Sequence, residues 1–143
     1  MDILVTNQSE VDMEVGRLKE LTAFVLEKER AVNGGDVSVA LVDPGKIQEL
    51  NLRYRRIDRP TDVLSFDLSD DGKLSGEVVI SPQIVLENAA SAAVVGGDEV
   101  ESVLVHGLLH LLGYTHDNDD DAEVMFDRHE AIHREFANSG RKP

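Results

Sequence analysis

The 143-residue chain is predicted to fold as one α+β domain, residues 1–143, in which a mixed sheet of about four strands is covered by about five helices. Three observations favour this class. The length and the 41% hydrophobic content suit a single core. Strand patterns occupy the first half and helical patterns dominate the second, without a linker or repeat between them. Helices separate the first three strands, which favours some parallel pairing, and a hairpin adds an antiparallel edge.

The first strand and the first helix are expected before residue 35. An apolar run at residues 3–5 predicts a short strand. Apolar residues at helical spacing predict a long amphipathic helix over about residues 10–31, with Ser9 and Asp12 as a capping box. Asn33-Gly34-Gly35 is expected to end this helix.

The next three elements complete the sheet and one of its layers. The stretch VSVALVD predicts a buried strand, and Asp43-Pro44 supplies an N-cap and a first-turn proline for a helix that continues to Tyr54. Two more strands are predicted over about residues 62–68 and 77–81. The turn SDDGKLSG joins them, so they are expected to pair as a hairpin.

The rest of the chain is predicted to be helical. Three helices are expected over about residues 82–94, 98–112 and 119–137. Gly96-Gly97 and residues 113–118 separate them.

The charge balance limits the partners that the chain can meet. It has 14 basic and 28 acidic residues and a formal net charge of −14, which opposes non-specific attraction to nucleic acid over the whole surface. The stretch RYRRIDR is a local exception. It concentrates four arginines: Arg53, Arg55, Arg56 and Arg59. This run is either a solvated charged loop or a docking site for RNA phosphates.

Cysteine usage and hydropathy bear on compartment and cofactor. No cysteine is present, so a transition-metal site must use histidine and carboxylate ligands. The N-terminus lacks a basic segment followed by an apolar run, and no stretch reaches the ~20 apolar residues of a membrane span. A soluble, cytoplasmic protein is expected, with no membrane partner.

The stretch HGLLHLLGYTHD, from His106 to Asp117, carries the strongest chemical signal. His106 and His110 lie one turn apart on a helix whose opposite side is apolar. Gly113 can take the left-handed conformation that turns the chain back and brings His116 toward the other two. Three imidazoles can hold one Zn²⁺ ion and leave a fourth position for water. The spacing therefore predicts a catalytic type of zinc site on this helix and its following turn.

Gly107 separates this site from a metallopeptidase. The spacing HxxxHxxGxxH resembles that of the metzincin proteases, which keep a catalytic glutamate where this chain has Gly107. Without that base, zinc can still activate water and neutralise charge, and a phosphodiester is a suitable substrate. A metallopeptidase remains the less favoured alternative.

A second histidine pair follows in HEAIH, from His129 to His133, which matches the zinc motif HExxH. His129 points into the apolar stripe of its helix, and Glu135 is the only good oxygen donor after His133. A structural role is favoured for this pair, and metal binding by it stays open.

Three segments together resemble one known family. LNLRYRRIDRPTDVLSFD, GEVVIS and HGLLHLLGYTHD closely resemble the YbeY family of bacterial single-strand-specific metallo-endoribonucleases, over roughly residues 50–132. The resemblance implies metal ligation by His106, His110 and His116 and a functional role for Arg55. It also implies maturation of the 16S rRNA 3′ end, quality control of the small ribosomal subunit, and that subunit and its assembly GTPase as partners. Glu77 departs from the aspartate common in the family and keeps its charge.

Roles follow for the candidate residues. Zinc on the three histidines, including His110 as a catalytic ligand, would activate water, and Arg55 would stabilise charge on the phosphate. Asp117 and Ser65 are candidates for orienting the site from behind the ligands, although each also suits a turn or an exposed strand position. A non-enzymatic alternative is also open: a ribosome-assembly factor in which zinc is structural and the arginines dock on rRNA. The oligomeric state is not predicted.

Overall fold

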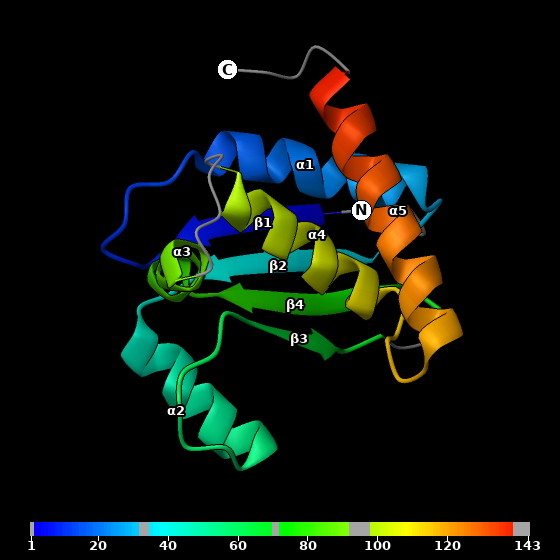
Figure 1. Ribbon diagram of the computed structural model, residues 1–143. Coiled ribbons are helices and arrows are strands. Elements are labelled where there is room, and N and C mark those ends of the chain that lie inside the picture. The colour runs from blue at the N-terminus through cyan, green and yellow to red at the C-terminus, as the bar shows by residue number, and fades with distance from the viewer. Residues whose placement is uncertain (1, 32–34, 70–71, 92–97, 139–143) are drawn as a thin grey trace.

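A computed structural model describes residues 2–31, 35–69, 72–91 and 98–138. It confirms the α+β class, with four strands and five helices in the predicted order among these residues (Figure 1). The elements are β1 (Asp2–Asn7), α1 (Val15–Lys28), β2 (Asp36–Leu41), α2 (Pro44–Arg55), β3 (Val63–Asp67), β4 (Ser75–Ile80), α3 (Pro82–Ser91), α4 (Glu99–Leu111) and α5 (Asp119–Asn138).

The sheet is mixed, with the strand order β1-β2-β4-β3. β1 pairs with β2 and β2 pairs with β4 in parallel, and Val39 lies opposite both Val5 and Val78. β3 pairs antiparallel with β4, so the predicted hairpin forms and places β3 at an edge. Ser65 lies opposite Val78 in this pair. The edge strand β3 therefore lies beside β4, which is an inner strand of the sheet.

The two faces of the sheet bury different helices. Because side chains alternate along a strand, Val78 of β4 joins the large core under α1, α4 and α5, whereas the next residue, Val79, joins a smaller core with α2. The smaller core consists of Val42, Ile47, Leu64 and Val79. In Figure 1, α4 crosses the sheet between α1 and α5 in the view, and α2 lies below β3. The α4 face of the sheet is the one that carries the histidines.

The predicted start of the first helix was wrong. Ser9 does not cap it: the Ser9 hydroxyl donates to Asn7 Oδ1 at 2.7 Å, and α1 begins only at Val15. Ser9 and its neighbours form a local turn instead, because a serine hydroxyl competes with the helix for nearby backbone and side-chain groups. The helix ends at Lys28, with Arg30 in the left-handed region at φ 56°.

Some predicted boundaries lie outside the described residues. These are Asn33-Gly34 after the first helix, residues 70–71 in the hairpin turn, residues 92–94 of the third helix, and Gly96-Gly97. Asp43 does occupy the N-cap position of α2, with Pro44 as the first helical residue. The Asp43 carboxylate accepts the backbone N–H of Glu10 at 2.9 Å, so it ties α2 to the segment before α1.

Within the described ranges, none of the helices combines the length and the apolar character needed to span a bilayer.

Candidate metal centre

Helix α4 presents two histidines because its other sides are fixed by the core. Leu104 and Leu108 are fully buried, whereas His106 and His110 are partly exposed. Between the histidines, Gly107 faces the sheet. A Cβ at this position would lie 2.8 Å from Val78 Cγ1 and 3.1 Å from Val63 Cγ2, so the helix lies closer to the sheet than a side chain would allow. This close approach sets the height of both imidazoles above the strands.

The third histidine is brought back by a glycine turn. Gly113 has φ +100°, and its backbone N–H donates to the His110 carbonyl at 3.0 Å. The N–H of Tyr114 donates to the Leu109 carbonyl at 3.0 Å, which completes a Schellman motif. The chain then reverses toward α4 and places His116 beside the other two rings, as the sequence predicted.

The three imidazoles converge. One nitrogen of each of His106, His110 and His116 lies within 4.8 Å of the others, and this is the only such group of three or more candidate ligands in the described part of the chain. The ring centroids of His106 and His110 are 4.6 Å apart, and those of His110 and His116 are 4.9 Å apart. The cluster can therefore hold a metal ion with small side-chain movements.

Burial keeps His106 and His110 in the protonation state that a metal requires. Desolvation, followed by repulsion from the neighbouring imidazoles, lowers the pKa of His106 to about 4. Burial and His116 lower the pKa of His110 in the same direction. Both rings are then neutral near pH 7, so their nitrogen lone pairs are available to a cation without prior loss of a proton.

The histidines open into a cavity of about 410 Å³. Arg55, at the end of α2, lines this cavity together with the three histidines. Alternate residues of β3 form another wall, because Val63, Ser65 and Asp67 point to the α4 side of the sheet. Thr61 and Asp62, from the loop before β3, also line it. An exposed guanidinium thus shares one cavity with the candidate metal ligands.

Ser65 connects the edge strand to α4. Its hydroxyl donates to the Gly107 carbonyl at 2.9 Å, at the point where the helix approaches the sheet most closely. Asp117 lies near His110, and its charge raises the pKa of that histidine against the larger effect of burial. Ser65 holds the helix that carries two of the imidazoles, and Asp117 acts on one ring through its charge.

The other three arginines lie outside the lining of this cavity. Arg53 pairs with Glu49 along α2 at 3.3 Å, and both side chains are exposed. Arg56 caps the C-terminus of α2 in the left-handed conformation, at φ 60°. Arg59 is exposed, and its carbonyl accepts from the buried Asn51 amide at 2.9 Å. These arginines lie at the end of α2 and in the segment after it rather than at the histidines.

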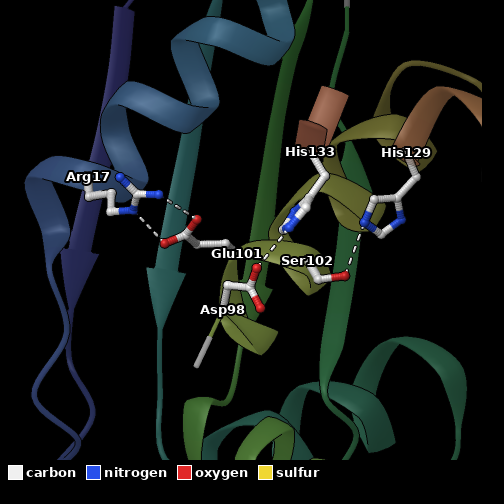
Figure 2. A network of polar contacts seen from close by, with 6 residues as sticks. All are labelled: Arg17, Asp98, Glu101, Ser102, His129 and His133. Carbon is white, nitrogen blue, oxygen red and sulfur yellow. Dashed lines mark hydrogen bonds and ion pairs between the residues drawn. The ribbon is translucent and has the colours of Figure 1, made fainter. Parts of the chain in front are cut away.

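The HEAIH pair forms different contacts. His129 Nε2 shares a hydrogen bond with Ser102 Oγ at 3.0 Å, and His133 Nε2 pairs with Asp98 Oδ2 at 2.8 Å (Figure 2). Glu135, the oxygen donor noted after His133, pairs with Lys28 of α1 at 2.7 Å. The two histidines join α5 to the first half of α4.

The sequence did not single out Asp67 as a lining residue. The sequence contained a pattern that could have identified it, because Val63, Ser65 and Asp67 have the two-residue spacing of one strand face. The cavity beside His129 and His133 was also missed, since it forms between helices that are distant in the sequence.

The fold and the site define a small α+β protein with a three-histidine cluster that can bind a metal ion next to an arginine. The family model described as Endoribonuclease YbeY matches residues 4–137 of the chain. The chain therefore belongs to the YbeY family.

Individual relatives agree with this assignment. The chain is 43% identical to Endoribonuclease YbeY of Carboxydothermus hydrogenoformans, with 90% of this chain and 92% of the relative covered. It is 39% identical to Endoribonuclease YbeY of a Sulfurihydrogenibium species, with 80% and 78% covered. Among solved structures, it is similar to the solution structure of TM1509 from Thermotoga maritima, at 32% identity and a TM-score of 0.66, over 98% of this chain and 91% of that one.

Proposed function

We propose that the protein is a zinc-dependent, single-strand-specific endoribonuclease. The observation that carries the proposal is the convergence of three histidine ligand atoms within 4.8 Å, in a cavity that Arg55 also lines. The similar proteins are named endoribonucleases, which supports RNA as the substrate. A zinc ion and a guanidinium in one cavity suit a phosphodiester, whose cleavage requires the neutralisation of developing negative charge.

The donor set fits one Zn²⁺ ion. Neutral imidazole is a good zinc ligand, and three protein ligands leave a coordination position open, as in catalytic sites. His106, His110 and His116 would hold the ion, and the open cavity in front of them gives access to a substrate. When bound, zinc lowers the pKa of a coordinated water and polarises a phosphate oxygen. Nitrogen ligands also accept other divalent transition metals, so zinc is the proposed ion among several that would fit.

Arg55 has the position and chemistry for the phosphate. Its guanidinium is exposed in the wall of the cavity that the imidazoles also line, where a planar set of N–H donors can bind two phosphate oxygens. The exposed arginines Arg53, Arg56 and Arg59 would attract the RNA backbone toward the same end of α2. The local positive charge would then overcome the repulsion from a chain of net charge −14 at close range.

Close packing of Gly107 argues against peptide hydrolysis by the same site. A glutamate here, as in metzincins, would have to pass through Val78 and Val63, because even a Cβ would lie 2.8 Å from Val78 Cγ1. The helix face that carries the general base in those proteases is therefore used for packing. Ribonuclease chemistry, which can rely on charge neutralisation, is the better match.

The cellular role is proposed from the family resemblance. It comprises maturation of the 16S rRNA 3′ end and quality control of the small subunit, in the cytoplasm, with the small ribosomal subunit and its assembly GTPase as partners. A zinc-stabilised assembly factor without activity would use the same arginines as a docking surface. The open cavity in front of the histidines favours the enzyme, because a structural zinc needs no access for substrate.

The decisive experiment is a gel time course with an end-labelled RNA that carries a single-stranded tail on a hairpin. Zinc-reconstituted protein is compared with His110→Ala protein purified in the same way. We expect cleavage only in the tail and loss of cleavage in the variant, because the variant lacks one ligand. Equal cleavage by both preparations would identify a contaminating nuclease and would leave the docking role as the better explanation.

A second variant tests the phosphate role separately. Arg55→Ala should retain zinc and lower kcat/KM by about 10²- to 10³-fold, as expected when a donor to a developing charge is lost. Arg53→Ala removes an equal charge outside the cavity and should reduce cleavage much less. Unchanged cleavage by Arg55→Ala would remove this arginine from the mechanism.

A further inference from the structure

A second cavity, of about 360 Å³, lies between α3, α4 and α5. Its volume falls within the range of small-molecule sites. Figure 2 shows Asp98 and Ser102 of the α4 region in contact with His133 and His129 of α5, and all four residues line this cavity. The polar lining includes Asp62, Asp98, Ser102, His129, Glu130 and His133. The proposed reaction assigns no task to this cavity.

The second cavity adjoins the three-histidine cavity. Asp62 lines both of them. On α4, Ser102 precedes His106 by four residues, so the two side chains lie on one side of the helix about 6 Å apart along its axis. An RNA strand with a phosphate at the histidines would therefore place a neighbouring nucleotide at this second cavity.

The charges of the lining decide which part of that nucleotide can enter. Four carboxylates border the cavity, from Asp62, Asp98, Glu99 and Glu130. They would repel a phosphate, which is attracted to the arginine side instead. Carboxylate oxygens accept hydrogen bonds from the exocyclic amino groups of nucleobases. The apolar side chains Val85, Ala89 and Val103 supply a surface for the base, and the two imidazoles can stack on it.

We infer that the second cavity binds the base of a nucleotide next to the cleaved bond and selects adenine, cytosine or guanine over uracil. The first three bases carry an exocyclic amino group, and uracil presents carbonyl oxygens at the corresponding positions. The inference rests on the proposed endoribonuclease function and adds a sequence preference to it.

The test uses zinc-loaded protein and single-stranded oligouridylates in which one uridine is replaced by A, C or G at successive positions around the cleaved bond. At one position adjacent to that bond, the amino bases should raise kcat/KM by about tenfold over uridine. The double variant Asp98→Asn, Glu130→Gln should reduce this preference, because it neutralises two of the four carboxylates that border the cavity. Asp98 is 52% exposed and Glu130 is also exposed, so these near-isosteric amides leave the packing intact.

The double variant Glu123→Gln, Asp127→Asn is the matched control, because it also removes two charges, from exposed positions of α5 that do not line the cavity. It should keep the full preference. Equal cleavage of all four RNAs by the parent protein, or an undiminished preference in the double variant Asp98→Asn, Glu130→Gln, would overturn the inference.

A binding measurement separates this inference from the proposed function. The same oligonucleotides are titrated with chelator-treated protein, and fluorescence anisotropy reports binding without cleavage. Tighter binding of the amino bases without any cleavage by the zinc-loaded protein would support the base site and contradict the endoribonuclease. Cleavage by the zinc-loaded protein, with no preference for the amino bases in either assay, would support the endoribonuclease and contradict the base site.

Discussion

Gly107 shows how one missing side chain determines both structure and chemistry. Its backbone lies against Val78 and Val63, and its carbonyl accepts the Ser65 hydroxyl at 2.9 Å. The residues on either side of this contact point, His106 and His110, are thereby held at a fixed height above the sheet. In the sequence, Gly107 was notable only because it stands where the metzincin proteases keep a catalytic glutamate. Its packing role depends on strands about 30 and 40 residues earlier, which no local pattern specifies.

Gly107→Ala should destabilise the protein by about 1–3 kcal/mol, because the added methyl overlaps Val78 Cγ1 in a closely packed core. It should also weaken zinc binding, since the helix must shift away from the sheet. Urea unfolding of the metal-free protein and zinc titration measure the two effects.

Gly16→Ala provides the opposite control. Gly16 lies near the start of α1 and has no heavy atom within 4 Å of an added Cβ, so alanine there should stabilise the helix by about 0.5–1 kcal/mol. The double variant Gly107→Ala, Val78→Ala should recover part of the zinc affinity. An equal gain in stability for both single alanine variants would mean that the stability of the protein does not depend on the close approach of α4 to the sheet at Gly107.

At the scale of the elements, local signals were reliable where one residue acts within its own turn. Gly113 was predicted to reverse the chain after α4, and its left-handed conformation and Schellman hydrogen bonds are present. Ser9 has an equally familiar capping pattern, yet its hydroxyl bonds to Asn7 and the helix begins later. A serine has several local partners to choose from, whereas a left-handed turn has few residues that suit it. Local patterns could not predict the second cavity either, because three helices form it together.

The contact between α4 and α5 contains a partly buried histidine that should make stability depend on pH. Burial is the largest cause of the lowered pKa of His129, with repulsion from His133 acting in the same direction and Glu130 opposing it. In the surrounding elements, the N-cap residue Asp98 of α4, Glu99 of α4 and Asp62 line the same cavity. The folded protein therefore disfavours protonated His129, whereas the unfolded chain takes up a proton near the ordinary histidine pKa of 6.5.

The free energy of unfolding should consequently fall as the pH is lowered through 6.5, and the loss should end once the folded His129 is also protonated. Urea unfolding of metal-free protein across this range measures the dependence. His129→Gln cannot take up this proton and should show a shallower fall, and the remaining histidines are present in both proteins. Identical pH profiles would show that proton uptake by His129 is not coupled to unfolding.

At the scale of the whole molecule, the distribution of charge matters more than its sum. The net charge of −14 opposes RNA binding over most of the surface, and the acidic stretch at residues 117–123 enters the exposed start of α5. The arginine run lies at the other side of the three-histidine cavity, at the end of α2 and in the segment after it. RNA should therefore approach from the α2 side, and the rest of the surface should contribute repulsion that salt screens.

This arrangement predicts the salt dependence of RNA binding. Each phosphate neutralised on a single strand contributes about −0.7 to the slope of log K against log salt concentration, so Arg53→Ala and Arg56→Ala should each make the slope shallower by up to about 0.7. Lys19→Ala removes the same charge from an exposed position on α1, across the sheet from α2, and should leave the slope unchanged. The measurement is fluorescence anisotropy with a single-stranded RNA at several salt concentrations, using chelator-treated protein to prevent cleavage. An equal change for all three variants would mean that the charge of the whole molecule governs binding; a change confined to the two arginines would locate the RNA on the α2 side.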